Sequence, residues 1–234
     1  MYQEDHEGSF TKMKSIATRV LRRIWHEAYY RIHQYRNRNK SSIITRLQGH
    51  AKSIAIIGNG PIDRDVSEVV DECDIVIRFN AARNWGGNAG RRFDVLVLAV
   101  GATNLLKLRG SEFLQAASEI WFEGNSLKKT WEETPQTGQL RSARFYKNRS
   151  KAILAANRLK QPVWAINQSV RALASNELAR FSENPARAVD PSNGMATICA
   201  CRQYFPNATL KLVGFGFFGT GPHDWNAERE YVAA

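Results

Sequence analysis

The chain has 234 residues, which fits one globular domain with an appendage and is long enough to bury a sizeable core. Its hydrophobic content is 43%, and no apolar run approaches the roughly 20 residues of a membrane-spanning helix, which excludes a spanning protein. The net charge is +11, and residues 1 to 52 hold 11 Lys and Arg against 4 Asp and Glu, so +7 of that charge lies in the first fifth of the chain.

The N-terminal region is predicted to be a basic arm, residues 1 to 50, ahead of a domain at 51 to 234. In residues 15 to 35, apolar side chains recur at helical spacing with arginines between them, which indicates a basic amphipathic helix. Such a helix either lies on an anionic membrane surface or a partner, or docks on its own domain. We expect no nucleic-acid partner, because no nucleic-acid motif accompanies the charge.

Cysteine usage and the N-terminus indicate the compartment. Cys73, Cys199 and Cys201 fit a reducing environment better than a disulfide scaffold. Cys199 and Cys201 lie two residues apart on a predicted helix and point to different sides, which disfavours a metal pair. The N-terminus also lacks the apolar core and small-residue cleavage site of a secretion signal. We therefore expect a cytoplasmic protein that is either free or in peripheral contact with a membrane through residues 15 to 35.

The most informative stretch runs from Ser53 to Asp94. Residues 53 to 57 are a short apolar run, typical of a strand buried on both faces of a parallel sheet. Gly58-Asn59-Gly60-Pro61 then breaks the run, because glycine allows a sharp turn and proline suits the first turn of a helix. A helix that begins there would aim its free N–H groups at the turn, which predicts an anion site.

A second strand is predicted at Asp74 to Asn80, after a helical segment that carries Val66, Val70 and Cys73 on one face. Strand, crossover helix and strand of this length form a parallel βαβ unit, whose ligand lies at the carboxyl ends of the strands. We therefore expect the glycine turn and Asn80 to meet.

Three familiar ligand sites can be tested against this unit. Asp63 occupies the place of the third glycine of a dinucleotide fingerprint and the second strand ends in Asn80, which argues against NAD. A P-loop lysine and Ser/Thr are absent. Asp63-Arg64-Asp65 has the spelling of a metal-binding D-x-D, but acids in a first helical turn are favoured by the helix dipole alone. The remaining site has neutral donors and suits one phosphodiester, with cations nearby at Arg78, Arg91 and Arg92.

The rest of the chain alternates between strands and helices. Further buried strands are predicted at 95–100, 120–123 and 163–167, with helices at 105–117, 140–159 and 168–181. A helix up to 205 and a strand at 210–216 follow. This alternation predicts an α/β fold with a doubly wound, mostly parallel sheet. The polar segment 124–138 has no periodicity, and is either a lid over an acceptor site or a surface loop.

Three stretches, in order, resemble the sialylmotifs of the animal-type sialyltransferases. Residues 53 to 94, with GNG, IRFN and GRRFD, look like the large motif, and residues 190 to 216, with DPSNGM and LKLVGFG, look like the small motif. His223 to Glu228 has the H-x4-E spacing of the very small motif. The likeness is greatest to short bacterial members of this group, some of them labelled urease operon accessory proteins.

The resemblance implies a Rossmann-like glycosyltransferase fold, a GT-A-like variant, that uses a CMP-sugar donor and no metal. Asn59 and Asn80 would hold the donor phosphate and ribose, and His223 would be the general base, since the histidine pKa lies near working pH. The implied catalytic residues are His223 and Glu228. The implied donor-binding residues are Gly58, Asn59, Gly60, Pro61, Asn80, Ser192, Asn193, Gly194 and Gly214.

We therefore predict a metal-independent, inverting glycosyltransferase that moves sialic acid or a related acidic sugar from a CMP-sugar donor to a glycan acceptor, with no further cofactor. Two features depart from the family: Ile54 stands where animal enzymes carry a cysteine, and only six residues separate Gly216 from His223, where a third sialylmotif is expected. These departures leave an alternative open, a CMP-binding module that has lost transfer activity and has a regulatory or accessory role.

Overall fold

The structure, a computed structural model, describes residues 21, 28, 42–98, 112–122, 162–166, 168–183, 190–219 and 223–234. The chain divides into two units, Met1–Asn39 and Lys40–Ala234. In the first unit only Leu21 and Ala28 are described, so apart from these two residues the amphipathic helix predicted for residues 15 to 35 lies outside the described residues. The predicted segments 124–138 and 140–159 lie outside them as well.

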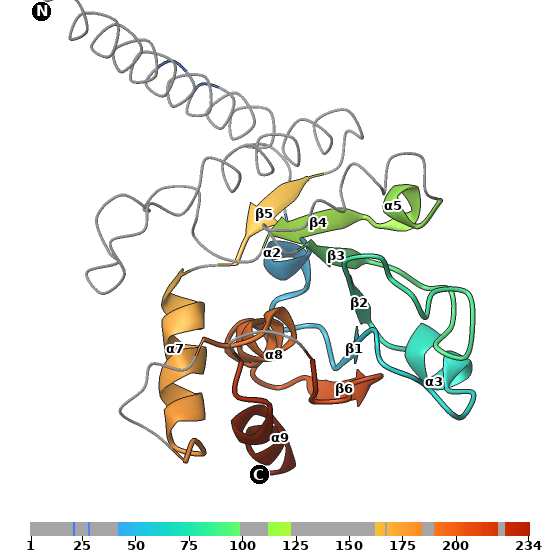
Figure 1. Ribbon diagram of the computed structural model, residues 1–234. Helices are drawn as coiled ribbons and strands as arrows, with labels where there is room; N and C mark the ends of the chain where they lie inside the picture. The colour runs from blue at the N-terminus through green and yellow to red at the C-terminus, as the bar shows by residue number, and fades with distance from the viewer. Residues whose placement is uncertain are drawn as a thin grey trace, which may run out of the picture. The chain divides into compact units, whose positions relative to one another are not determined.

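Six strands form one parallel sheet in the second unit (Figure 1). Their order is β5-β4-β3-β2-β1-β6, and each neighbouring pair is parallel. The strands are β1 (Ser53–Ile57), β2 (Ile75–Phe79), β3 (Val95–Leu98), β4 (Glu119–Phe122), β5 (Val163–Ala165) and β6 (Thr209–Val213). Every strand that the sequence predicts is present, and the predicted Rossmann-like α/β fold is confirmed.

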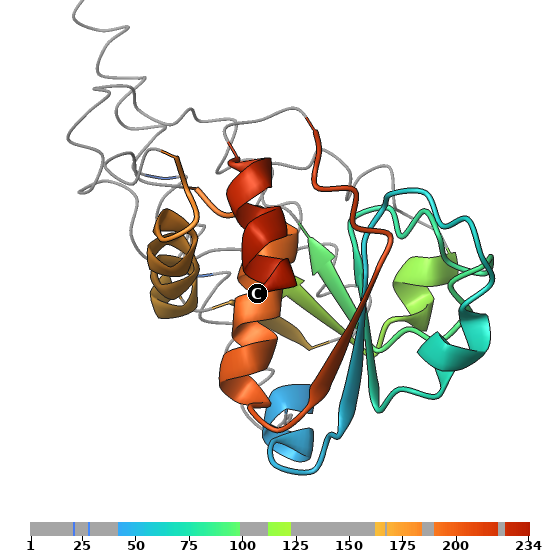
Figure 2. The ribbon, with the colours of Figure 1, turned by 90° about the horizontal axis from the view of Figure 1, so that it is seen from below.

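Helices cover both faces of the sheet, as Figure 2 shows. The helices α3 (Ser67–Asp71) and α5 (Glu112–Ala116) lie on one side, and α7 (Gln168–Ala179), α8 (Asn193–Tyr204) and α9 (Trp225–Ala233) lie on the other. The described part of the chain thus has three layers.

The two faces of the sheet bury separate sets of side chains. Ile54 and Ile56 of β1 belong to a large core shared with α7, α8 and α9. Ala55 and Ile57 belong to a smaller core that includes Val70 of α3. This division follows from the period of two along a strand, which sends successive side chains to opposite faces. The apolar run at 53–57 is therefore a strand covered on both faces, as its composition predicts.

A short helix, α2 (Ile43–Leu47), begins the second unit. Ser42 caps it by accepting a hydrogen bond from the N–H of Thr45. Ile43 is buried in the large core, and its N–H donates to the buried carboxylate of Glu119 at the start of β4, at 2.9 Å. Residues 42 to 47, which the sequence analysis assigned to the N-terminal arm, thus pack as part of the second unit.

The strand order places a switch point between β1 and β6. From β1 the chain winds outward through β2, β3, β4 and β5, and then returns to pair β6 with the other side of β1. In doubly wound sheets, ligands bind outside the carboxyl ends of the strands at this reversal. Here those ends are Ile57 and Val213, which are partners in the register of the two strands.

The helix after the glycine turn begins later than predicted. α3 begins at Ser67, and residues 61 to 66 are not helical. Two hydrogen bonds explain the delay: the N–H of Val66 donates to Asn88 O at 2.8 Å, and the side chain of Asp65 accepts from the N–H of Ser67 at 2.9 Å. The prediction of a helix N-terminus at Pro61 is therefore wrong, and the anion site that it would create is not formed in that way.

A buried arginine shapes the loop between β2 and β3. Arg78 of β2 is 1% exposed, and its guanidinium donates to the carbonyls of Ala89 at 2.6 Å, Gly90 at 3.0 Å and Arg92 at 3.1 Å. Burial lowers the pKa of Arg78 to about 10. A charge this deep is tolerated because carbonyl oxygens replace its hydration. Arg78 is therefore occupied within the protein and does not serve as a cation for a ligand.

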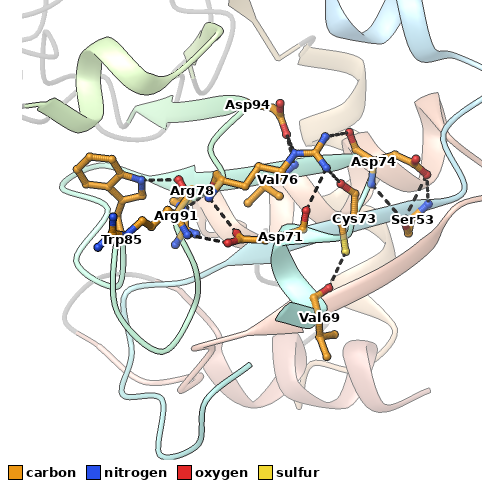
Figure 3. Close-up of polar contacts among 11 residues, drawn as sticks. Ser53, Val69, Asp71, Cys73, Asp74, Val76, Arg78, Trp85, Arg91 and Asp94 are labelled. Carbon is orange, nitrogen blue, oxygen red and sulfur yellow. Dashed lines mark hydrogen bonds and ion pairs between the residues drawn. The ribbon is translucent and has the colours of Figure 1, made fainter. Parts of the chain in front are cut away.

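The far end of the same loop is tied to the end of α3 and to the turn between α3 and β2 (Figure 3). The carboxylate of Asp71 accepts from the backbone N–H groups of Arg91 at 3.1 Å and Arg92 at 2.9 Å. The guanidinium of Arg92 donates to the carbonyls of Cys73 and Asp74 and pairs with Asp94 at 3.3 Å. Arg92 is thus also engaged in the fold rather than offered to a ligand.

Among the described residues, the helices are all too short or too polar to cross a membrane. Cys73, Cys199 and Cys201 are free thiols and buried, and burial raises the pKa of the Cys199 thiol. Both Cys199 and Cys201 belong to the large core.

Candidate ligand site at the switch point

The turn after β1 and the turn after β6 are joined by backbone hydrogen bonds. The N–H of Gly58 donates to Val213 O at 2.7 Å, and the N–H of Gly60 donates to Gly214 O at 2.9 Å. Gly214 has a φ of 67°, a left-handed conformation that favours glycine and ends β6. The ladder between the two strands thus continues past their ends.

Glycine is required here because the two backbones nearly touch. A Cβ on Gly58 would lie 2.2 Å from Gly214 O, and one on Gly60 would lie 2.8 Å from the same atom. The glycines predicted to approach a ligand therefore approach each other. Their N–H groups are already bonded, so a ligand at this edge must find its donors elsewhere.

Both ends of the Asn59 side chain are used to hold the turn against β2. Its Nδ2 donates to Phe79 O at 3.1 Å, and its Oδ1 accepts from the N–H of Arg83 at 3.1 Å. Asn80 follows directly at a φ of 51°, and its N–H donates to Val97 O at 2.9 Å. Asn59 and the start of the Asn80 loop therefore meet at the carboxyl ends of the strands, whereas Pro61 is exposed beyond the turn.

Asn84 is a residue of this region that the sequence analysis missed. Its Nδ2 donates to Gly58 O at 3.0 Å and to Gly60 O at 2.9 Å. Nothing in the sequence marks it, because it is one of several asparagines in a polar loop and its partners lie 24 and 26 residues away. The structural role of Arg78, by contrast, has a signal in the sequence, because Arg78 is a charged residue inside an otherwise apolar strand.

The N-terminus of α8 lies beside the β6 turn. A Cβ on Gly194 would lie 2.7 Å from the ring of Phe215, which follows Gly214 directly. The Phe215 ring also meets Phe79 edge to face, with 6.3 Å between ring centroids. Through Phe215, the start of α8 and the ends of β2 and β6 therefore come together. This places Asn193 and Gly194 at the same edge as the glycine turns.

Ser192 caps α8, and Glu228 of α9 holds Ser192. The Oγ of Ser192 accepts from the N–H of Met195 at 3.1 Å. The N–H of Ser192 donates to Glu228 Oε1 at 2.7 Å, and its hydroxyl donates to Oε2 at 2.8 Å. Glu228 is 2% exposed, and burial raises its pKa although these hydrogen bonds oppose the shift. Because both oxygens are occupied, Glu228 positions the start of α8 and does not itself face a ligand.

His223 is held just ahead of α9. Its Nδ1 lies 2.7 Å from the carbonyl of Asp190, which requires Nδ1 to carry the proton, so Nε2 of the neutral ring is an acceptor. The imidazole meets Trp225 edge to face, with 5.1 Å between centroids. Asp190 in turn pairs with Arg171 of α7. His223 is thus tied to the residue that leads into Ser192.

The Asp63-Arg64-Asp65 stretch is not in a first helical turn as predicted, because it precedes α3. The hydrogen bonds from Ser67 lower the pKa of Asp65. Within the ranges that the structure describes, no three His, Cys, Asp or Glu side chains gather in a way that could hold a metal ion.

Comparison with known proteins gives one informative relative. No family model matches the chain. A protein of Rhizobium meliloti (strain 1021), named urease operon 23 kDa accessory protein, is 28% identical over 192 residues, which cover 77% of this chain and 87% of the relative. The chain is therefore similar to that protein over most of both lengths.

This comparison corrects the functional predictions. The relative carries the name of an accessory protein, and no sialyltransferase family model is matched. The assignment to the sialyltransferases is therefore wrong, and so are the prediction of a glycosyltransferase and its partners, a CMP-sugar donor and a glycan acceptor. The alternative of an inactive CMP-binding module is withdrawn too, because only the family suggested CMP.

The glycine contact predicts a stability effect. Gly58→Ala should lower the free energy of unfolding by about 1–3 kcal/mol or more, because the new methyl group meets a backbone carbonyl that cannot move aside. Gly87→Ala is the matched control, since a Cβ there would meet nothing within 4 Å. Urea denaturation of both variants measures the difference, and equal stability of the two would contradict the proposed close contact.

The buried Glu228 predicts a pH dependence. Because its pKa is raised in the folded protein above an ordinary value of 4.5, the folded state binds the proton more tightly than the unfolded state. Stability of the wild-type chain relative to Glu228→Gln should thus increase as the pH falls from neutrality towards 4.5. Urea titrations across this range measure it, with Glu230→Gln, an exposed change on α9, as control. If the stability of the wild-type chain relative to Glu228→Gln instead decreased as the pH fell, the raised pKa of Glu228 would be wrong.

Proposed function

We propose that this chain is an accessory protein of a urease system. The observation that carries the proposal is the extent of the similarity to the Rhizobium meliloti protein, which spans 87% of that protein rather than one shared motif. The aligned 192 residues are too many to be confined to the glycine turn or to the α8 N-terminus. The match thus supports a shared role for the whole α/β unit.

We further propose that the unit binds a small phosphate-bearing ligand at the β1–β6 switch point. Three features support such a ligand: the position of the reversal, the N-terminus of the 12-residue helix α8, and the amide side chains beside it. Asn193 and Gly194 would contact the phosphate, Asn80 and Phe215 would contact the rest of the ligand, and Nε2 of His223 would accept a hydrogen bond. Gly58, Asn59, Gly60, Ser192, Gly214 and Glu228 would shape the site from behind.

We propose that the protein acts in a reducing compartment. The buried free thiols of Cys73, Cys199 and Cys201 support this, since a chain made for an oxidising compartment would more commonly pair its cysteines.

The accessory role can be tested in the relative's own organism. Deletion of the relative's gene in Rhizobium meliloti should lower urease activity per unit of urease protein, and expression of this chain should restore most of it. Gly58→Val, expected to disrupt the β1 turn, is the control for expression without a folded site. Full urease activity in the deletion strain, or no restoration by this chain, would overturn the accessory role.

A further inference from the structure

We propose that Asn84 is the positioning residue of the switch-point site, and that its side-chain amide sets the direction of the glycine turn against β6. This inference rests on the ligand site proposed above. It assigns a role to a residue that no sequence motif and no relative indicates.

The hydrogen bonds of Asn84 carry the inference. Its Nδ2 has two protons and donates to two carbonyls of one turn, Gly58 O at 3.0 Å and Gly60 O at 2.9 Å. Asn84 Nδ2 thus holds the first and third carbonyls of the three-residue turn 58–60. Neither of these two peptides can rotate without losing a hydrogen bond. The neighbouring Arg83 adds a third link, from its N–H to Asn59 Oδ1 at 3.1 Å.

The same nitrogen also lies against β6. A Cβ on Gly214 would be 3.2 Å from Asn84 Nδ2, so the amide packs directly on the left-handed glycine. The N–H of Gly60 donates to Gly214 O and belongs to the 59–60 peptide, which lies between the two peptides whose carbonyls Asn84 holds, Gly58 O and Gly60 O. Asn84 therefore acts on Gly214, and through Phe215 on the residues beside the start of α8.

The loop that carries Asn84 is itself held rigidly. Arg78 donates to carbonyls at its far end, at Ala89 and Gly90, and its Nη1 lies 3.5 Å from Asn84 O. A buried charge thus fixes the backbone from which the Asn84 amide reaches the turn. Loss of that amide should alter the turn while leaving the loop in place.

The chain provides a matched control in Asn88. It lies in the same loop, and its Nδ2 also donates to a backbone carbonyl across the gap, Ile62 O at 3.2 Å, but this carbonyl lies beyond the glycine turn. Asn88→Ala removes the same kind of bond from the same loop without touching Gly58, Gly60 or Gly214.

The test measures two properties of the full-length chain in wild type, Asn84→Ala and Asn88→Ala. The first is hydrogen exchange at the Gly60 amide without ligand, compared with exchange at Ile56 in the core. The second is the affinity for orthophosphate. Asn84→Ala should speed Gly60 exchange and weaken orthophosphate binding, each by at least about tenfold, since one hydrogen bond of about 1 kcal/mol or more is lost at each of two carbonyls. Asn88→Ala should change neither by more than about twofold.

Each outcome decides a different claim. Gly60 exchange in Asn84→Ala that matches Asn88→Ala would overturn the clamp. Faster exchange with unchanged orthophosphate affinity would overturn the positioning role, because the clamp would then serve only the fold. A wild-type chain that binds no orthophosphate would overturn the proposed ligand site instead. If Asn84→Ala does not fold, Asn84→Asp, which keeps the shape and removes the N–H2 donor, must show the same two effects for the proposal to stand.

Discussion

The close approach of two backbone turns at the ends of β1 and β6 is the contact on which this structure depends. Gly58 and Gly60 both lie against Gly214 O, so no side chain can separate the strands at the point where the sheet reverses direction. Gly214 turns the chain in the left-handed region, and Phe215, which follows it, lies against the start of α8. Polar side chains secure this geometry from both sides: Arg78 of β2 and Asn84 of the loop after it on one side, and Glu228 of α9 on the other.

Most of the fold could be predicted from the sequence, because strands buried on both faces leave apolar runs such as residues 53–57, and β2 and β3 follow the same rule. The residue at which a helix begins was harder to predict from the sequence. α3 begins at Ser67 rather than Pro61 because Val66 and Asp65 find partners outside the helix, and such tertiary bonds leave no periodic signal.

The sequence predicts which residues meet at the ends of β1 and β6, but not what those residues contact. Glycines at positions 58, 60 and 214 predict close approach, yet a sequence cannot tell approach to a ligand from approach to another backbone. Glu228 similarly has the spacing of a functional residue and serves to hold Ser192. The motif likeness to sialyltransferases therefore came from residues that mostly build the switch point, which is why it predicted the fold correctly and the activity wrongly.

The central claim is that a phosphate-bearing ligand binds at the β1–β6 switch point. The most direct measurement is nuclear magnetic resonance of the nitrogen-labelled chain during titration with orthophosphate. The largest chemical-shift changes should occur at the backbone amides of Asn193, Gly194 and Phe215 and at the side-chain amide of Asn80. No saturable change, or changes centred away from these residues at the β5 edge of the sheet, would contradict it.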